Sequence, residues 1–246
     1  MTEPAASAPP PHRICSTSLR PTISNMLWRY LRGQMPDWLN GSSGPVGWVL
    51  KTHRGVQFLD KVHVGEKQKR DVFHKKFSIR YNQQFEQVVR ACADPSREGK
   101  TWITDELVDA YVALHRAGFA HSYECWVEDK LVGGAFGLQV GGWISVESMY
   151  HTVSNASKAA YVQTLLRLRE RGFSFVDVQV VSPHMAYWGA QWIPQWRFEQ
   201  LVRDAIRQPL TLTDDQRPAR LPWRIRVGLP AVRLLRGLAR RVLRRK

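Results

Sequence analysis

The sequence predicts a fold of the α/β class, of the α+β type, with a mixed and mainly antiparallel sheet. Several stretches alternate apolar and polar residues and are separated by short turns, as antiparallel strands are. Between them lie longer stretches with apolar residues at helical spacing. One short stretch, residues 174–181, is apolar at nearly every position, which is typical of a strand buried on both faces.

The N-terminal region is expected to contain a leader and a small subdomain. Residues 1–22 begin with a run rich in proline, alanine and serine, and are predicted to be a flexible leader. Helical spacing of apolar residues predicts a helix over 24–39, and the Gly-Ser-Ser-Gly-Pro run at 41–45 predicts a turn. We therefore expect a small N-terminal subdomain over residues 23–60.

The main domain is expected over residues 61–208. Thr104 is a favourable N-cap residue for a helix, and Gly118 follows the predicted end of that helix. In chain order, the other predicted elements are a strand at 77–81, a helix at 85–92, a three-stranded antiparallel meander at 122–126, 131–140 and 143–149, a helix at 155–171 and a strand at 174–181. A meander, a helix and a further buried strand follow one another in the N-acyltransferase superfamily, so we expect a GNAT-like core.

Length and composition limit the classes of protein. The 246 residues, 43% of them hydrophobic, are enough for one full-sized core. No stretch has the length and apolarity of a membrane span, and the first residues lack an apolar signal core, so a cytoplasmic location is expected. Cys15, Cys92 and Cys125 are widely spaced, which supports neither a disulfide framework nor a cysteine zinc site.

The formal net charge of +15 is concentrated in a basic C-terminal tail, predicted over residues 209–246. No acidic residue follows Asp215, whereas eleven lysines and arginines do. Within the tail, an apolar stripe surrounded by arginines predicts an amphipathic helix over Val232, Leu235, Leu238, Ala239 and Val242. Such a helix can bind a polyanion or lie peripherally on an anionic membrane surface, and a purely solubilising tail is the alternative.

Two polar residues interrupt the apolar strand at 174–181. Asp177 and Gln179 lie two positions apart, so both side chains of a regular strand point to the same face. Because an ionised carboxylate is almost never buried without a partner, the pair lines either a cleft or a closed hydrogen-bonded network. Glu147, which is flanked by apolar and aromatic residues, also needs a buried partner.

Other catalytic chemistries find little support in the sequence. The histidines lack the spacing of zinc ligands, and no Gly-x-Ser-x-Gly run offers a serine nucleophile. The run nearest to a coenzyme A loop, residues 169–174, fails at its last position and lies at a helix C-terminus, where the dipole repels phosphate. We therefore expect no metal and no coenzyme A donor.

A basic cluster precedes the first strand of the main domain. Lys69, Arg70, Lys75 and Lys76 crowd into one short stretch. Such a cluster is typical of phosphate contacts, which position a nucleic acid without reading its sequence.

Together, these residues resemble the leucyl/phenylalanyl-tRNA-protein transferase family. The matching segments run in family order over about residues 61–205: Glu98–Thr104, Ala110–Tyr111, Leu114–His115, Gly118–Glu124, Leu131–Gly134, Gly137, Glu147–Met149, Asn155–Lys158 and Asp177–Gln179. The resemblance implies an acyltransferase-type domain that moves leucine or phenylalanine from its tRNA to a protein beginning with Arg or Lys. Aminoacyl-tRNA is then the co-substrate, and no further cofactor is expected.

The resemblance also implies roles for individual residues. Asp177 would orient or deprotonate the attacking amine, and Gln179 would help to place the reacting carbonyl. The positions implied to bind substrate or the terminal adenosine are Trp102, Ala135, Ile144, Glu147, Ser148 and Thr164. The positions implied to grip the acceptor stem of the tRNA are Lys69, Arg70, Lys75 and Lys76.

Several positions depart from the family pattern. Ala135 stands where the family has Met, Thr164 where it has Phe, and Tyr187-Trp188 where it has Ser-Leu. The changed pocket leaves the transferred amino acid open, and the changed rim leaves the acceptor open. One alternative is therefore a small-molecule, peptide natural product or lipid acceptor for the same donor. Another is a non-catalytic protein that binds RNA or a membrane.

Overall fold

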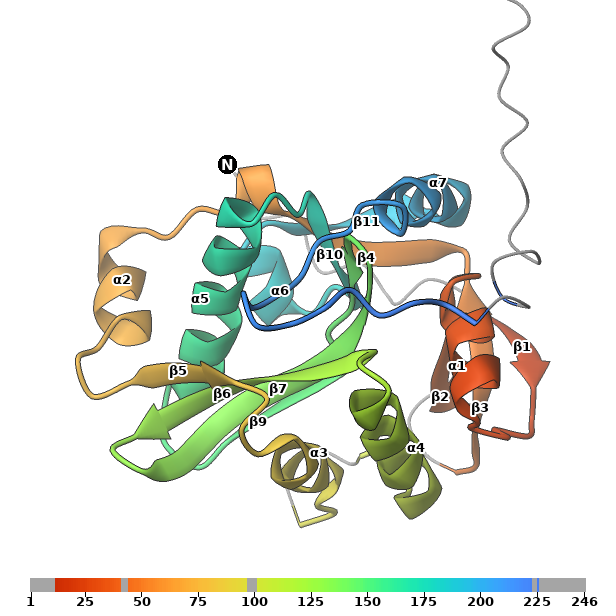
Figure 1. The fold of residues 1–246 in the computed structure, drawn as a ribbon, viewed down its shortest axis with the longest axis horizontal. Helices are drawn as coiled ribbons and strands as arrows, with labels where there is room; N and C mark the ends of the chain where they lie inside the picture. The colour runs from red at the N-terminus through yellow and green to blue at the C-terminus, as the bar shows by residue number, and fades with distance from the viewer. Residues whose placement is uncertain (1–11, 41–43, 97–100, 223–224, 226–246) are drawn as a thin grey trace, which may run out of the picture.

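The computed structural model describes residues 12–40, 44–96, 101–222 and 225 of the chain. It shows a mixed α/β fold with antiparallel sheets (Figure 1). The strands are β1 (His12–Ser16), β2 (Gln34–Trp38), β3 (Val46–Lys51), β4 (His53–Phe58), β5 (Ser78–Tyr81), β6 (Ala120–Val127), β7 (Lys130–Val140), β8 (Trp143–Ile144), β9 (Ser148–His151), β10 (Phe175–Gln179) and β11 (Ala190–Pro194). The helices are α1 (Ile23–Tyr30), α2 (Glu66–Val72), α3 (Phe85–Ala93), α4 (Asp105–Arg116), α5 (Ala156–Glu170), α6 (Pro183–Tyr187), α7 (Gln195–Ala205) and the short 3-10 helix η1 (Leu59–Lys61).

The N-terminal part contributes a sheet with the strand order β1-β3-β2, beside helix α1. Residues 12–16, which fall in the expected flexible leader, form β1 and pair with β3. The helix predicted over 24–39 ends at Tyr30, and β2 follows at residues 34–38, so this prediction is wrong in its second half. Gly33 has a φ of 73° between the two elements, a conformation that glycine adopts readily and other residues rarely.

Strand β4 connects the first 60 residues to the end of the main domain. It is the central strand of the sheet β10-β4-β11 and is antiparallel to both neighbours. β4 precedes the domain boundary predicted at residue 60, whereas β10 and β11 lie far beyond it. This pairing places Arg54 of β4 within reach of Asp177 on β10.

The larger sheet has the order β5-β6-β7-β8, and β9 also pairs with β7. The helices predicted before and after the meander are confirmed as α3, α4 and α5, and Thr104 caps α4 by accepting the Leu107 N–H. The single strand predicted over 143–149 is wrong, because β8 and β9 are separate. Ser148 lies four positions after Ile144, whereas their partners on β7, Phe136 and Gln139, are only three positions apart. The extra residue makes a β-bulge over 145–147.

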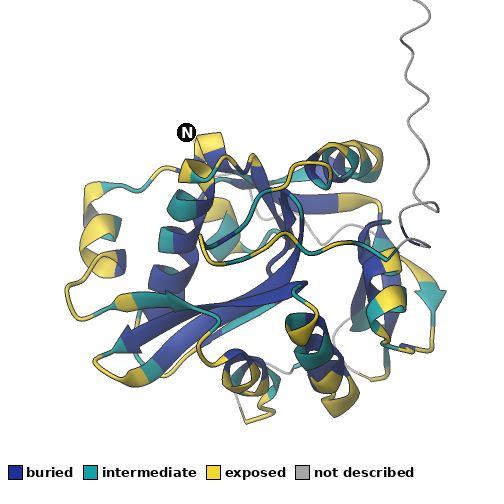
Figure 2. Cartoon of the chain, in the orientation of Figure 1, coloured by how far each residue is buried: buried dark blue, intermediate teal, exposed yellow. Residues whose placement is uncertain are grey.

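Two groups of buried apolar side chains form the core (Figure 2). The first group joins α1, α3 and α4 and includes Tyr30 and Tyr111. The second group joins α5 to the larger sheet and includes Ala135 and Ile144. Figure 2 shows β6 and β7 as dark, buried strands and the outer surface of α2 as exposed. The polar residues described below bond to members of both groups.

After α7, the chain runs as an extended segment across the molecule (Figure 1). Arg171, at the end of α5, donates to the Thr211 carbonyl oxygen in this segment, and Gln216 contacts His121. The amphipathic helix predicted over 232–242 lies outside the described residues. In the described part of the chain, no helix is long and apolar enough to cross a membrane.

Candidate active site

Asp177 on β10 forms a closed ion pair with Arg54 on β4. Arg54 Nε lies 2.8 Å from Asp177 Oδ1, and Arg54 Nη2 lies 2.9 Å from Oδ2. Both side chains are 0% exposed. This bidentate geometry engages both carboxylate oxygens with one guanidinium. Of the two interpretations of the strand pair, a cleft or a closed network, the structure shows the hydrogen-bonded network.

Gln179, the last residue of β10, has an unusual backbone conformation. Its φ is 61°, and the Val180 N–H donates to the Val178 oxygen at 2.6 Å, which closes a tight turn around Gln179. The Gln179 N–H donates to Asp177 Oδ1 at 3.0 Å. Such a conformation costs of order 1–3 kcal/mol and is found mainly where function requires it. The Asp177 carboxylate thus supports the turn from which the Gln179 side chain projects.

Glu147 is the second buried carboxylate of the site. Its Oε2 accepts hydrogen bonds from Gln179 Nε2 at 2.7 Å, Tyr30 at 2.6 Å and Tyr111 at 3.4 Å. Its Oε1 accepts from Ser145 at 2.6 Å. The two tyrosine hydroxyl oxygens are 2.6 Å apart, and because each hydroxyl has one proton, Tyr111 donates either to Tyr30 or to Glu147 when Tyr30 donates to Glu147. We call the following set the polar network: Tyr30, Arg54, Tyr111, Ser145, Glu147, Asp177 and Gln179.

The β-bulge between β8 and β9 presents Ser145 and Glu147 to the polar network. A Cβ at Gly137 of β7 would lie 1.7 Å from the Ser145 oxygen, so the close approach of the bulge requires glycine there. The Leu138 N–H donates to Ser145 Oγ at 3.1 Å, and the Val146 N–H donates to the Asp177 carbonyl oxygen at 2.9 Å. Bulges often re-aim a side chain beside an active site, and this one turns Glu147 inward.

Burial dominates the electrostatics of the polar network. It raises the pKa of the Glu147 carboxyl above its usual range, although hydrogen bonds from Ser145, Tyr30 and Gln179 favour the ionised form. Burial, and next the neighbouring Glu147, raises the pKa of Tyr30 and of Tyr111 well above the usual range. Both hydroxyls therefore keep their protons and act as donors at neutral pH.

One side of the polar network comes closer to the surface than the other. Glu147 is 8% exposed and Gln179 is 4% exposed, whereas Arg54 and Asp177 are 0% exposed. Because Glu147 and Gln179 are themselves buried, a substrate contacts them only where neighbouring side chains move. Besides the N–H given to Glu147, the Gln179 amide has a second N–H and a carbonyl oxygen for such a contact.

The remaining residues predicted to bind substrate are distributed over both core groups. Ala135 and Ile144 are fully buried in the second group. Thr164 on α5 is buried, and its hydroxyl has no hydrogen-bond partner among the described residues. Ser148 is half-buried at the start of β9. Trp102 is half-buried before α4 and packs against the first group.

The four residues predicted to bind the acceptor stem lie on one exposed segment. Lys69 and Arg70 belong to α2, and Lys75 and Lys76 to the turn that follows it. Lys69 forms an exposed ion pair with Glu66 of the same helix. The polar network has no member in this segment.

Sequence reasoning missed the roles of four members of the polar network: Tyr30, Arg54, Tyr111 and Ser145. Tyr30 and Tyr111 lie at apolar helical spacing, and this pattern hides the use of their hydroxyls. Arg54 gave a signal that could have been used, because this arginine stands directly beside Gly55 and Val56 in the strand β4. A buried cation needs a buried anion, and the sequence had already singled out two carboxylates.

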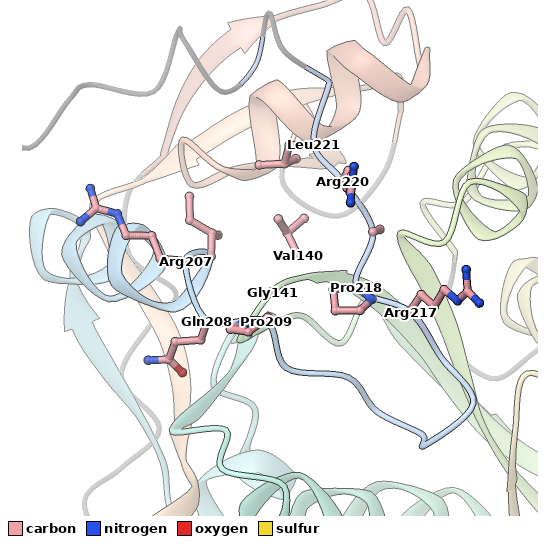
Figure 3. A pocket seen from close by; sticks show the side chains of 11 residues that line it. Val140, Gly141, Arg207, Gln208, Pro209, Arg217, Pro218, Arg220 and Leu221 are labelled. Atoms are coloured by element: carbon pink, nitrogen blue, oxygen red, sulfur yellow. The ribbon is translucent and has the colours of Figure 1, made fainter.

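A separate cavity of about 880 Å³ lies between the end of α7, the turn after β7 and residues 217–221 (Figure 3). Arg207, Arg217 and Arg220 border it. Figure 3 shows the Arg207 and Arg217 side chains extending away from each other, so their charges do not converge on one ligand position. No member of the polar network lines this cavity.

Comparison with known proteins shows the class to which this protein belongs. A family model described as leucyl/phenylalanyl-tRNA protein transferase matches residues 56–203, which include Glu147, Asp177 and Gln179. The protein is thus an aminoacyltransferase with a mixed α/β fold and a buried polar network within the matched region.

Relatives extend the match over most of the chain. The leucyl/phenylalanyl-tRNA-protein transferase of Myxococcus xanthus is 36% identical over 210 residues, which cover 82% of this chain and 88% of the relative. That of Rubrobacter xylanophilus is 41% identical over 179 residues, which cover 72% of this chain and 91% of the relative. The chain belongs to the leucyl/phenylalanyl-tRNA-protein transferase family.

Solved structures are similar only at a distance. FemX has a TM-score of 0.43 and 10% identity, with 61% of this chain and 64% of that chain covered. L-PGS from Bacillus licheniformis has a TM-score of 0.41 and 13% identity, with 63% of this chain and 65% of that chain covered. Both scores are too low to carry a conclusion about this chain.

Proposed function

We propose that this protein transfers the amino acid of an aminoacyl-tRNA to the N-terminal amine of a protein, forming an amide bond. The relatives reported above are leucyl/phenylalanyl-tRNA-protein transferases. The observation that carries the proposal is the 2.7 Å hydrogen bond from Gln179 Nε2 to Glu147 Oε2. It orients a carboxamide at the less buried side of the polar network, where an ester carbonyl and an amine can be held together.

The reaction needs positioning more than activation. The donor ester is already reactive, and an α-amino group with a pKa of about 7.7–8.0 is partly neutral at pH 7. The amine nitrogen attacks the ester carbonyl, the new C–N bond forms and the bond to the ribose oxygen breaks. The proton lost by the nitrogen ends on that ribose oxygen. Holding two such groups in line can supply about 7–11 kcal/mol of the barrier.

In this proposal Gln179 contacts the reacting groups. Its second amide N–H can stabilise the ester oxygen as negative charge develops, and Glu147 keeps the amide in one orientation. We assign Asp177 the role of an electrostatic anchor, because Arg54 engages both of its oxygens. A general base would need an oxygen within reach of the amine proton.

The transferred side chain is proposed to enter between β7 and α5. Ala135 on β7 pairs with Tyr123 on β6 and with Met149 on β9. Together with Ile144 and Thr164, Ala135 would set the size and polarity of this pocket. Trp102, Glu147 and Ser148 are proposed to hold the terminal adenosine.

The proposal extends to partners and location. Lys69, Arg70, Lys75 and Lys76 are proposed to contact acceptor-stem phosphates. Aminoacyl-tRNA is proposed as the co-substrate, with no further cofactor or metal, in the cytoplasm. The GNAT-like core and the division of the chain at residues 22, 60 and 208 stay predictions. The peripheral membrane contact predicted for residues 232–242 concerns a segment outside the described residues.

The test is transfer of label from a pool of radiolabelled aminoacyl-tRNAs to a protein that begins with Arg or Lys. We expect Gln179→Ala to lower transfer about 100- to 1000-fold, the loss typical of one removed transition-state hydrogen bond. Gln191→Ala is the matched control, because Gln191 lies on β11 of the same sheet and outside the polar network. Its rate should stay close to that of the parent.

Three other outcomes would count against parts of the proposal. Transfer to a small amine or a lipid headgroup, and not to protein, would show that the acceptor is not a protein N-terminus. Equal loss in the Gln179→Ala and Gln191→Ala variants would remove Gln179 from the chemistry. Binding of tRNA without any transfer would leave a non-catalytic RNA-binding protein.

A further inference from the structure

A groove lies between α2 and α6, away from the polar network. It consists of two hollows of about 210 and 400 Å³ that share Gln68 of α2 and Tyr187 and Trp188 at the end of α6. We call this feature the α2–α6 groove. The hollows are further lined by charged residues, including Lys61, Asp71 and Lys158.

One wall of the α2–α6 groove is aromatic. Tyr187 is 60% exposed, and its ring meets the ring of Trp188 edge to face, with centroids 5.1 Å apart at 83°. Trp188 is 3% exposed, and its buried Nε1 has no hydrogen-bond partner among the described residues. The wall therefore presents the exposed ring of Tyr187, and the buried ring of Trp188 packs against it.

The charge of the α2–α6 groove favours an anionic ligand. Lys61 and Lys158 line it against the single carboxylate of Asp71. His184 also lines it, and burial, followed by the neighbouring Lys158, lowers the pKa of this imidazole, so it is neutral at pH 7. On the outer side of the same helix α2 lie Lys69 and Arg70. The groove thus continues a positively charged surface inward.

We propose that the α2–α6 groove receives the unpaired nucleotides at the 3′ end of tRNA, and that Tyr187 provides the surface on which one base stacks. The inference rests on the proposed function, because that function requires a tRNA end to travel from the acceptor-stem contacts to Gln179. The groove has the right connections for this path. Its α2 wall belongs to the helix that also carries Lys69 and Arg70, and its α6 wall begins at Pro183, four positions after Gln179.

The chemistry of the groove fits a nucleotide better than a peptide. An aromatic face takes the π-face of any base, the lysines suit phosphates, and Asp71 can accept from an exocyclic amine of a base. A protein acceptor presents a cationic N-terminus when protonated, and the excess of lysine over aspartate in the groove disfavours it.

The experiment measures the binding of two RNA minihelices, neither of them aminoacylated, to the full-length protein at one salt concentration. One minihelix ends in unpaired 3′ nucleotides, and the other has the same duplex with a blunt end. We expect Tyr187→Ala to weaken binding of the first about 5- to 150-fold and to leave the second unchanged, as stacking losses of this kind predict. Tyr187→Phe keeps the ring and should keep the affinity. Trp196→Ala is the control, since Trp196 is a 62% exposed aromatic residue on α7, outside the groove.

The outcomes separate this inference from the proposed function. If Tyr187→Ala weakens both minihelices equally, or neither, the groove does not hold the unpaired end. If it leaves RNA binding unchanged and raises the KM for the protein acceptor, the groove holds the acceptor and the inference is overturned. Both results leave transfer by the parent protein intact. Failure of the parent to bind either minihelix would overturn the inference and the proposed function together.

Discussion

Among single residues of the candidate active site, Arg54 is the one whose substitution we expect to lower the stability of the protein most. It is the ionic partner of Asp177, and both side chains are fully buried. Arg54→Met leaves a buried carboxylate without its cation, so we expect the free energy of unfolding to fall by about 3–5 kcal/mol. The double variant Arg54→Met/Asp177→Leu should recover much of this loss, because neither charge of the ion pair is then left buried without its partner. Urea unfolding followed by circular dichroism measures both.

The matched control for this prediction is Arg90→Met. Arg90 pairs with Glu86 on the surface of α3, where the two side chains are 54% and 49% exposed. Solvent screening limits such a pair, so we expect a loss much smaller than that of Arg54→Met. Similar losses for Arg54→Met and Arg90→Met would show that the buried ion pair contributes no more to the free energy of unfolding than an exposed one.

His121 gives the protein a dependence of stability on pH. Burial, followed by the charge of His115, lowers the pKa of His121 to about 4, against about 6.5 when unfolded. Between these values the unfolded chain binds the proton and the folded chain does not. Stability is therefore highest above about pH 6.5 and falls toward pH 4, by up to about 3 kcal/mol from this residue.

His121→Gln removes the titrating group and should flatten the curve of stability against pH between about 4 and 6.5. The measurement is the urea midpoint at several pH values for the parent and the variant. A variant whose stability falls as steeply as that of the parent would assign the dependence to other groups.

At the scale of elements, the bulge between β8 and β9 is the feature that builds the site. Gly137→Ala would place a Cβ 1.7 Å from the Ser145 oxygen, so β7 or the bulge must move. We expect a loss of about 1–3 kcal/mol in the free energy of unfolding, together with lower transfer activity, because Glu147 moves with the bulge. Thermal unfolding and the label-transfer rate test the two effects.

Gly65→Ala is the control for this glycine. The φ of Gly65 is −68°, and an added Cβ would meet only the flexible side chain of Gln68. Its stability should therefore stay near that of the parent. If Gly137→Ala were equally harmless, the bulge would be able to shift without disturbing Glu147.

For the whole molecule, the formal net charge of +15 predicts that RNA binding depends on salt. Arg70 and Lys75 are exposed on and after α2. We expect Arg70→Ala/Lys75→Ala to weaken tRNA binding irrespective of tRNA sequence, and to reduce the slope of log K against log salt by roughly one to two. Titrations at several salt concentrations measure the slope. Arg90→Ala on α3 removes an exposed charge elsewhere on the surface. An equal change of slope for this variant would mean that the charges act only through the net charge of the protein and not through local contacts with RNA.

The sequence by itself predicted the strands β5, β6 and β7 and the helices α3, α4 and α5, because alternation and helical spacing are local properties. It also singled out Asp177, Gln179 and Glu147, since polar groups in apolar stretches stand out without any structure. The sequence-based prediction failed where a local pattern was outweighed by strand pairing. Residues 34–38 lie at helical spacing yet form β2, because pairing with β3 outweighs a weak propensity.

Only the tertiary structure decided which groups meet. Asp177 pairs with Arg54 across 123 positions, and Glu147 accepts from Tyr30 across 117 positions. These contacts exist because β4 pairs with β10 and because α1 packs onto the larger sheet, and neither arrangement is encoded in a local pattern. The physical reason is that a buried charge is stabilised by whichever opposite charge the folded chain brings within hydrogen-bond distance, and sequence separation plays no part in that energy.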